Sequence, residues 1–332
     1  MKVLFTGIQP TGDIHLGNFF GAIANWVRLQ RDYDSFISVV DLHALTIPYE
    51  ASEMPGRVLD LATTLYACGL DMKSTTLFVQ SEVPGHADLT WIFNSITPLG
   101  ELERMTQFKD KREQFRASVN VGLLDYPVLQ AADILLYKGE VVPVGEDQVQ
   151  HVEFTREVAR HFNTRFGETF PECQALLTTA PRVLGLDGDA KMSKSKGNTI
   201  GVLETPEQIW KKLGPAKTDP ARVRRTDPGT PENCTIWSYH RLVTQEPELS
   251  EIHTGCTTAG IGCIDCKKRF QANLMKVLDP IRGRYAELST DGRKQVEERL
   301  EANAARCRSV ASQTMLEVKE KMGLRKVWKI QA

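Results

Sequence analysis

Apolar and polar positions along the first 200 residues predict short strands separated by helices. The strand-like runs are apolar and often β-branched, as buried strands usually are. They span residues 2–6, 35–41, 75–80, 141–144 and 182–186. Helical stretches, with apolar residues at three- and four-residue spacing, span 18–33, 54–70 and most of 101–137. This alternation indicates an α/β fold with a Rossmann-like, doubly wound parallel sheet and helices on both of its faces.

The pattern changes after residue 200, where strand-like runs disappear. Residues 214–231 are rich in Pro, Gly, Thr and Arg and predict a loop. Helix dominates from Lys267 onward, and the final helix carries one apolar stripe. The stripe comprises Val296, Leu300, Cys307, Ala311, Val318 and Met322. Because 332 residues suit two domains, we expect an α/β domain over 1–200 and a mainly helical domain over 201–332.

Composition argues against membrane-spanning and disordered proteins. Hydrophobic residues make up 41% and charged residues 25% of the chain, with a formal net charge of −1, as in ordinary globular domains. No apolar run approaches the roughly 20 residues of a membrane helix, and the first residues do not resemble a signal peptide. We therefore expect a cytoplasmic protein with no membrane or DNA partner, in which a local patch would have to hold any polynucleotide.

The turn after the first predicted strand carries Gly7, Gly12, His15, Gly17 and Asn18. A glycine-bearing turn that opens a helix directs backbone N–H groups at an anion. Ligands of open α/β sheets also bind at the carboxyl ends of strands, where this turn lies. The turn matches neither the dinucleotide-binding fingerprint nor the P-loop. By itself it is equally compatible with a plain strand–helix turn capped by Asn18.

A second loop, residues 191–198, reads KMSKSKGN. Three lysines within six residues are incompatible with a packed element, and such charge runs are usually solvated. The functional alternative is that mobile ammonium groups cover a polyphosphate and stabilise the charge of a departing phosphate group.

Asp133 stands in an otherwise apolar helical stretch, so its carboxylate needs hydrogen bonds. Helical spacing places it on one face with Tyr126, Gln130 and Tyr137. This face is either a polar network satisfied within the protein or the floor of a pocket whose carboxylate accepts an N–H from a ligand. Tryptophan, with one side-chain donor and a large apolar body, fits such a floor.

Four of the seven cysteines form the pattern C-x21-C-x6-C-x2-C, made by Cys234, Cys256, Cys263 and Cys266. In a chain without an export signal, such clustering favours a metal site over disulfides. Zinc is the default for four thiolates, and a [4Fe–4S] cluster takes the same ligands. The three isolated cysteines are expected to be small buried residues.

Together, His15-Leu16-Gly17-Asn18 and Lys191-Met192-Ser193-Lys194-Ser195 resemble the HIGH and KMSKS motifs of class I aminoacyl-tRNA synthetases. Asn18 replaces the final His of the first motif. The stretches FTGIQPTG (5–12), GELERMTQFKDK (100–111), YPVLQAADILLY (126–137) and VPVGEDQ (142–148) are similar to bacterial tryptophanyl-tRNA synthetases. The family implies activation of tryptophan with Mg-ATP, transfer to tRNA-Trp, a helical anticodon-binding domain and a homodimer. The alternatives are a tyrosyl enzyme and a paralogue that binds RNA or senses tryptophan without charging tRNA.

The resemblance also implies a residue set for each substrate. Lys111, Lys191 and Lys194 would be catalytic and hold the triphosphate. The other ATP-binding residues would be Gln9, Pro10, Thr11, His15, Gly17, Asn18, Gly145, Glu146, Asp147, Val183, Met192, Ser193 and Ser195. The tryptophan-binding residues would be Phe5, Gly7, His43, Tyr126, Gln130, Asp133, Val142, Val144 and Gln148, with Asp133 accepting the indole N–H.

Two further features relate this chain to particular branches of the family. Gln130 stands where many bacterial members carry Met. The four cysteines resemble those of a bacterial subset that holds a [4Fe–4S] cluster near the anticodon-binding region, which favours the cluster over zinc.

Overall fold

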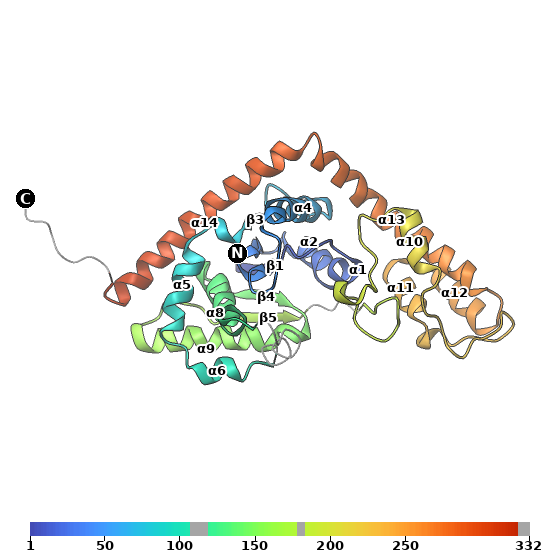
Figure 1. Ribbon diagram of the computed structural model, residues 1–332, viewed down its shortest axis with the longest axis horizontal. Helices are drawn as coiled ribbons and strands as arrows, with labels where there is room; N and C mark the ends of the chain where they lie inside the picture. The colour runs from blue at the N-terminus through green and yellow to red at the C-terminus, as the bar shows by residue number, and fades with distance from the viewer. Residues whose placement is uncertain (107–118, 178–182, 325–332) are drawn as a thin grey trace, which may run out of the picture.

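The computed structural model describes residues 1–106, 119–177 and 183–324, and within these ranges its centre is a five-stranded parallel sheet (Figure 1). The strands are β1 (Val3–Ile8), β2 (Asp34–Val39), β3 (Thr76–Val79), β4 (Val141–Val144) and β5 (Gln174–Leu177). Their order is β3-β2-β1-β4-β5, so the chain starts in the middle and winds outward in both directions. This is the predicted doubly wound α/β arrangement, and the fold class is confirmed.

Helices flank the sheet, and within the described residues the elements that follow β5 are helical. Those up to β5 are α1 (Leu16–Asn18), α2 (Ala24–Leu29), α3 (Asp41–Ala44), α4 (Met54–Ala67), α5 (Gly85–Asn94), α6 (Leu99–Glu103), α8 (Val121–Leu136) and α9 (Val149–Phe166). Those after β5 are α10 (Pro206–Leu213), α11 (Thr235–Val243), α12 (Glu248–Thr257), α13 (Cys263–Ser289) and α14 (Arg293–Lys321). None of the described helices is both long and apolar enough to cross a membrane.

Two apolar clusters hold these layers together. One contains Ile23, Leu65 and Phe270 and joins α4 to α11 and α13. The other contains Phe93 and Phe162 and joins α5, α8 and α9 to α14. Both clusters include residues from before and after residue 200, so the later helices are packed onto the α/β part. The domain boundary at residue 200 itself remains a prediction.

Helices α13 and α14 meet at an apex, from which α14 runs back across the molecule (Figure 1). Of its six predicted stripe residues, four are buried and two are partly buried. The Asn303 side chain donates a 2.8 Å hydrogen bond to the Leu77 carbonyl of β3, and Arg306 pairs with Asp34 at 2.7 Å. The C-terminal helix therefore covers the β3 side of the sheet.

Two sequence predictions need correction. Residues 183–186 are not a strand but part of a loop, in which Leu184 forms an isolated bridge with Lys191. The Leu186 N–H donates to the Asn198 carbonyl, which ties the segment to the 191–198 loop instead of the sheet. The fifth strand is β5, which is short and partly exposed and so lacks the apolar signature of a buried strand. The predicted helix over 18–33 is divided by a π-helical turn, Phe19–Ile23, and ends at Leu29.

Candidate active site

A cavity of about 330 Å³ lies between β1 and β4, at the carboxyl ends of these strands. The strand order reverses between these two strands, and ligands of open α/β sheets bind at such a switch point. All nine residues predicted for tryptophan line the cavity. They are Phe5, Gly7, His43, Tyr126, Gln130, Asp133, Val142, Val144 and Gln148. The structure thus gathers into one cavity side chains from β1, α3, α8, β4 and the turn after β4.

Asp133 at the cavity floor is 1% exposed and accepts three hydrogen bonds from the protein. Gln80 Nε2 and His86 Nδ1 lie 2.7 and 2.6 Å from its Oδ1. His43 Nε2 lies 2.8 Å from its Oδ2. Burial alone would raise the pKa of the Asp133 carboxyl, but the hydrogen bonds and charges of His43 and His86 outweigh it and hold the pKa well below its usual range. Asp133 is therefore an ionised acceptor at neutral pH.

Gln80 and His86 were missed by sequence analysis. Both are fully buried, and they lie 53 and 47 positions from Asp133 in the chain. Since a buried carboxylate requires donors, the sequence indicated that partners must exist. It carried no signal that identified them.

Tyr126 and Gln148 are joined through a third residue that the sequence analysis did not name. The Tyr126 hydroxyl lies 2.9 Å from His151 Nε2, and His151 Nδ1 lies 2.9 Å from Gln148 Oε1. Burial raises the pKa of the Tyr126 hydroxyl, which stays protonated at neutral pH. This chain of polar groups holds one side of the cavity in place.

The two motif loops lie against each other beside the cavity. Lys194 Nζ donates to the carbonyl oxygens of Gly12 at 2.7 Å and Thr11 at 3.3 Å. Gly12 adopts a φ of +104°, and a Cβ there would lie 3.5 Å from Cδ of Lys194. The basic loop therefore reaches over the turn after β1, as two halves of one anion site would.

His15 and Asn18 cap the short helix α1 reciprocally. The His15 N–H donates to Asn18 Oδ1 at 3.2 Å, and the Asn18 N–H donates to His15 Nδ1 at 3.3 Å. Burial, together with the charges of Lys194 and Lys191, lowers the pKa of His15 to about 4. The imidazole is thus neutral at physiological pH and remains an acceptor. A Cβ on Gly17 would lie 2.9 Å from this ring, which explains the glycine.

The 191–198 loop is anchored by Asn198, another residue without an assigned role in the sequence analysis. Its Oδ1 accepts the Ser193 N–H at 2.8 Å, and its Nδ2 donates to Asp187 Oδ2 at 2.8 Å. A Cβ on Gly185 would lie 2.0 Å from Asn198 Nδ2, so only glycine fits there. These contacts set the position from which Lys194 extends.

The remaining residues predicted for ATP lie around these loops, with one exception. Gln9 and Gly145 line the cavity, while Glu146 and Asp147 are exposed beside it. Other buried or loop positions in this region are Pro10, Val183, Met192 and the backbone of Ser195. The third predicted lysine, Lys111, lies outside the described residues.

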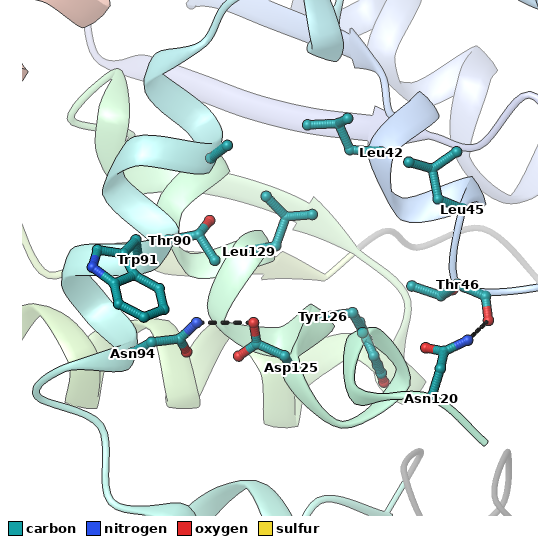
Figure 2. A pocket seen from close by; sticks show the side chains of 12 residues that line it. Leu42, Leu45, Thr46, Thr90, Trp91, Asn94, Asn120, Asp125, Tyr126 and Leu129 are labelled. Atoms are coloured by element: carbon teal, nitrogen blue, oxygen red, sulfur yellow. Dashed lines mark hydrogen bonds between the residues drawn. The ribbon is translucent and has the colours of Figure 1, made fainter.

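A second cavity of about 350 Å³ is lined by residues of α3, α5 and α8 (Figure 2). Leu42, Leu45, Trp91 and Leu129 make it largely apolar, and Tyr126 lines both this cavity and the one at the switch point. Trp91 is 77% exposed. We call this apolar hollow, with its exposed tryptophan, the α5/α8 groove.

The four cysteines of the C-x21-C-x6-C-x2-C pattern line one small cavity of about 20 Å³. In the described part of the chain, however, no group of three or more His, Cys, Asp or Glu side chains is arranged to hold a metal ion. The predicted gathering of these cysteines is observed, whereas the iron–sulfur cluster and the zinc alternative gain no support from a preformed ligand geometry.

Two cationic side chains are buried beside these cysteines. Arg222 Nη1 lies 3.8 Å from Cys256 Sγ, and Nη2 donates to the Ile261 carbonyl at 2.6 Å. The buried Nε of Arg222 has no hydrogen-bond partner among the described residues. Lys267 Nζ donates to the Gly214 and Ala216 carbonyls at 2.6 and 2.7 Å. This surrounding positive charge suits an anionic group between the sulfur atoms.

Comparisons with known proteins agree with this geometry. The family described as "tRNA synthetases class I (W and Y)" matches residues 2–279. The chain is 52% identical to the tryptophan–tRNA ligase of Deinococcus radiodurans, over 98% of this chain and 100% of that protein. It is 43% identical to that of Thermotoga maritima, over 98% and 99%. The structure is similar to tryptophanyl-tRNA synthetase from Campylobacter jejuni complexed with ADP and tryptophan, with a TM-score of 0.89, 34% identity and coverage of 97% and 100%.

Proposed function

Since the chain belongs to the class I tRNA synthetases for tryptophan and tyrosine and is a tryptophan–tRNA ligase, we propose that the β1–β4 cavity binds tryptophan and that the two motif loops bind ATP. The observation that supports this assignment is that the two proposed sites lie next to each other. All nine residues predicted for tryptophan line one cavity, and Lys194 reaches the turn after β1 beside it.

The proposed tryptophan site combines apolar walls with few polar groups. Phe5, Val142 and Val144 would pack on the indole ring, and Asp133 would accept its N–H. Tyr126 and Gln148, linked through His151, would face the α-amino group. Tyrosine as the substrate is disfavoured because the relatives named above are tryptophan ligases.

The first reaction is attack of the tryptophan carboxylate on the α-phosphorus of Mg-ATP. The new C–O–P linkage forms as the bond to pyrophosphate breaks, giving tryptophanyl-adenylate. Because the nucleophile is already ionised, no general base is required, and catalysis depends on alignment and charge stabilisation. Lys191 and Lys194, with Lys111, would neutralise the departing pyrophosphate.

In the second step a ribose hydroxyl at the end of tRNA-Trp takes the tryptophanyl group and releases AMP. The helical region after residue 200 would receive the anticodon, and exposed Arg224 and Arg225 in the loop before α11 offer positive charge there. The cytoplasmic location predicted from the sequence remains a prediction.

Two assays test this function. ATP–pyrophosphate exchange with tryptophan and with tyrosine identifies the activated amino acid, and aminoacylation of a tRNA-Trp transcript tests the transfer. Tyrosine-dependent exchange would replace the tryptophan assignment. Exchange without aminoacylation would instead favour the paralogue that does not charge tRNA.

We also propose that Cys234, Cys256, Cys263 and Cys266 hold a structural metal centre, a [4Fe–4S] cluster in preference to zinc. The unpartnered Arg222 Nε and the buried Lys267 fit an anionic tetrathiolate group. Such a centre supplies cross-links between the loop before α11, the end of α12 and the start of α13. It would lie outside the adenylation site and would take no part in that chemistry.

Anaerobically purified protein is expected to contain about four iron and four sulfide per chain. Cys266→Ser should lose this content and unfold at a lower temperature, because metal binding is linked to folding. Cys68→Ser, at a buried cysteine outside this cavity, should retain it. Metal analysis, the visible spectrum and thermal unfolding are measured together. One zinc and no iron, from cells with ample iron, would overturn the cluster but not the four-cysteine site.

We further propose that the α5/α8 groove is covered by a second copy of the chain, in the homodimer that the family resemblance implies. Leu45 and Trp91 line the groove and are 47% and 77% exposed, and Val121, which lies in the chain between the lining residues Asn120 and Gly122, is 79% exposed. Burial of such side chains would favour association by about 25 cal/mol for each Å² of apolar area.

Trp91→Asp should therefore shift the chain from dimer to monomer, since the charge would have to be buried at the contact. Val223→Asp, at an 84% exposed apolar residue remote from the groove, is the matched control and should leave the oligomeric state unchanged. Sedimentation velocity over a range of concentrations measures both. A Trp91→Asp variant that stays dimeric would show that the groove is not the contact.

A further inference from the structure

We propose that His86 and Gln80 are positioning residues for indole recognition, which saturate one oxygen of Asp133 and so reserve the other for the ligand N–H. This inference rests on the proposed binding of tryptophan in the β1–β4 cavity. A carboxylate oxygen offers about two acceptor positions. Gln80 and His86 together occupy both positions of Oδ1, whereas His43 occupies one position of Oδ2.

Neither residue can touch the ligand directly. His43 and Asp133 line the cavity, but Gln80 and His86 do not. Both have 0% exposed surface. Gln80 lies in the turn after β3 and His86 in the first turn of α5, and both contact Oδ1 of the carboxylate. Any effect that they have on substrate choice must therefore pass through Asp133.

The orientation of the Gln80 amide is determined by its surroundings. Its Oε1 accepts the backbone N–H of Leu42 at 3.1 Å, so the group directed at Asp133 must be the NH₂ donor. Leu42 belongs to α3, the helix that also carries His43. The bond from Leu42 thus ties Gln80, which donates to Oδ1 of Asp133, to α3, whose His43 contacts Oδ2.

His86 is likewise fixed at both ring nitrogens. Because the Asp133 carboxylate only accepts, Nδ1 of His86 carries the proton that is donated to Oδ1. Nε2 forms a second hydrogen bond with the Tyr137 hydroxyl, which lies 2.9 Å away. The Tyr137 ring stacks on Phe36, with a centroid distance of 4.7 Å and an interplanar angle of 23°. A rigid aromatic layer therefore holds the imidazole, and through it the carboxylate.

The consequence is a site that is selective for a ligand N–H. Because both acceptor positions of Oδ1 are filled, the carboxylate is held against rotation. Oδ2 then keeps one acceptor position for a ligand in the cavity. A site built for a hydrogen bond rejects an isostere that lacks the donor far more strongly than a purely apolar pocket does. Loosening the carboxylate should erode this selectivity without altering the shape of the pocket.

The test compares tryptophan with its benzothiophene analogue, 3-(3-benzothienyl)alanine, in which sulfur replaces the indole N–H. ATP–pyrophosphate exchange gives kcat/KM for each, and the ratio of the two is the readout. His86→Gln keeps a polar group near Tyr137 but loses the donor to Asp133, whereas His86→Asn keeps a donor at the Nδ1 position. Gln80→Met removes the other donor with little change in volume.

We expect His86→Gln and Gln80→Met to lower the ratio by about tenfold or more, chiefly through KM for tryptophan. His86→Asn should stay within about threefold of the parent ratio, because its donor is retained. In an Asp133→Asn background, His86→Gln should leave the ratio unchanged. If His86→Gln and Gln80→Met slow both substrates equally, the two residues are merely structural and the inference is wrong. A parent enzyme without tryptophan-dependent exchange would instead refute the proposed function.

Discussion

Asp133→Ala is expected to lower the free energy of unfolding by about 3–5 kcal/mol, the usual cost of removing one partner from a buried charged network. The substitution would leave the donors of Gln80, His86 and His43 buried without their acceptor. It should also lower kcat/KM for tryptophan, since the proposed acceptor for the indole is lost. Urea unfolding and ATP–pyrophosphate exchange measure the two effects.

The stabilisation by Asp133 depends on pH, and the lowered pKa of its carboxyl determines the direction of that dependence. The pKa of Asp133 is lower in the folded protein than in the unfolded chain, where it is about 3.9. Its contribution to stability is therefore fully present above that value and is lost as the pH falls through the folded pKa. The difference in free energy of unfolding between the parent and Asp133→Ala should therefore become smaller in strong acid. Asp133→Asn, which keeps the shape, is the control. A loss of stability under about 1 kcal/mol for the alanine variant, no more than one ordinary hydrogen bond, would contradict the network.

Lys194→Ala is expected to slow formation of tryptophanyl-adenylate by about 10²–10³-fold, the range found when one preorganised donor to a developing negative charge is removed. Lys194 does not line the β1–β4 cavity proposed for tryptophan. Its ammonium group is held by the neutral carbonyls of Gly12 and Thr11. A departing pyrophosphate at this turn would offer a charged acceptor in their place, so the lysine acts in the transition state.

Tryptophan affinity should change by less than about threefold in this variant, because the lysine contributes nothing to ground-state binding of the amino acid. Rapid-quench measurement of the adenylate and calorimetric titration with tryptophan separate the two quantities. Lys294→Ala, at an exposed lysine on α14, is the matched control and should match the parent. A large loss of tryptophan affinity with an unchanged rate of adenylate formation would show that Lys194 does not have this role.

Local sequence patterns were sufficient for much of the fold. The β4 run, 141–144, was predicted with the observed bounds, and β1, β2 and β3 were predicted to within a few residues. The apolar stripe of α14 was also predictable, because burial of one helix face imposes a period that is visible in the chain. Where local character was weak, prediction failed. The short, partly exposed β5 was missed, and residues 183–186 of the run predicted as a strand are bound to the 191–198 loop.

The candidate site divides in the same way. Motif residues such as Lys194 and Asp133 could be selected from the sequence because their chemistry contrasts with their neighbours, or because they resemble a family. The residues that hold Asp133 and the 191–198 loop in place, His86, Gln80 and Asn198, have no such contrast. Each lies at the end of an ordinary strand, loop or helix. Gln80 and His86 meet Asp133 only because of the order in which the strands pair and the helices pack, whereas Asn198 bonds to Ser193 and Asp187 within its own stretch of chain.

The sequence by itself determined the strand–helix alternation, the two motif loops and a carboxylate that required donors, because periodicity and local chemistry depend on neighbouring residues. The tertiary structure decided which donors those are, that all nine residues predicted for tryptophan line one cavity, and that Lys194 bonds to the turn after β1. It also placed Tyr126 between the α5/α8 groove and the β1–β4 cavity, both of which it lines. The reason is physical: the free energy of a buried hydrogen bond depends on distance and direction in space, and chain separations of 47 or 53 residues carry neither.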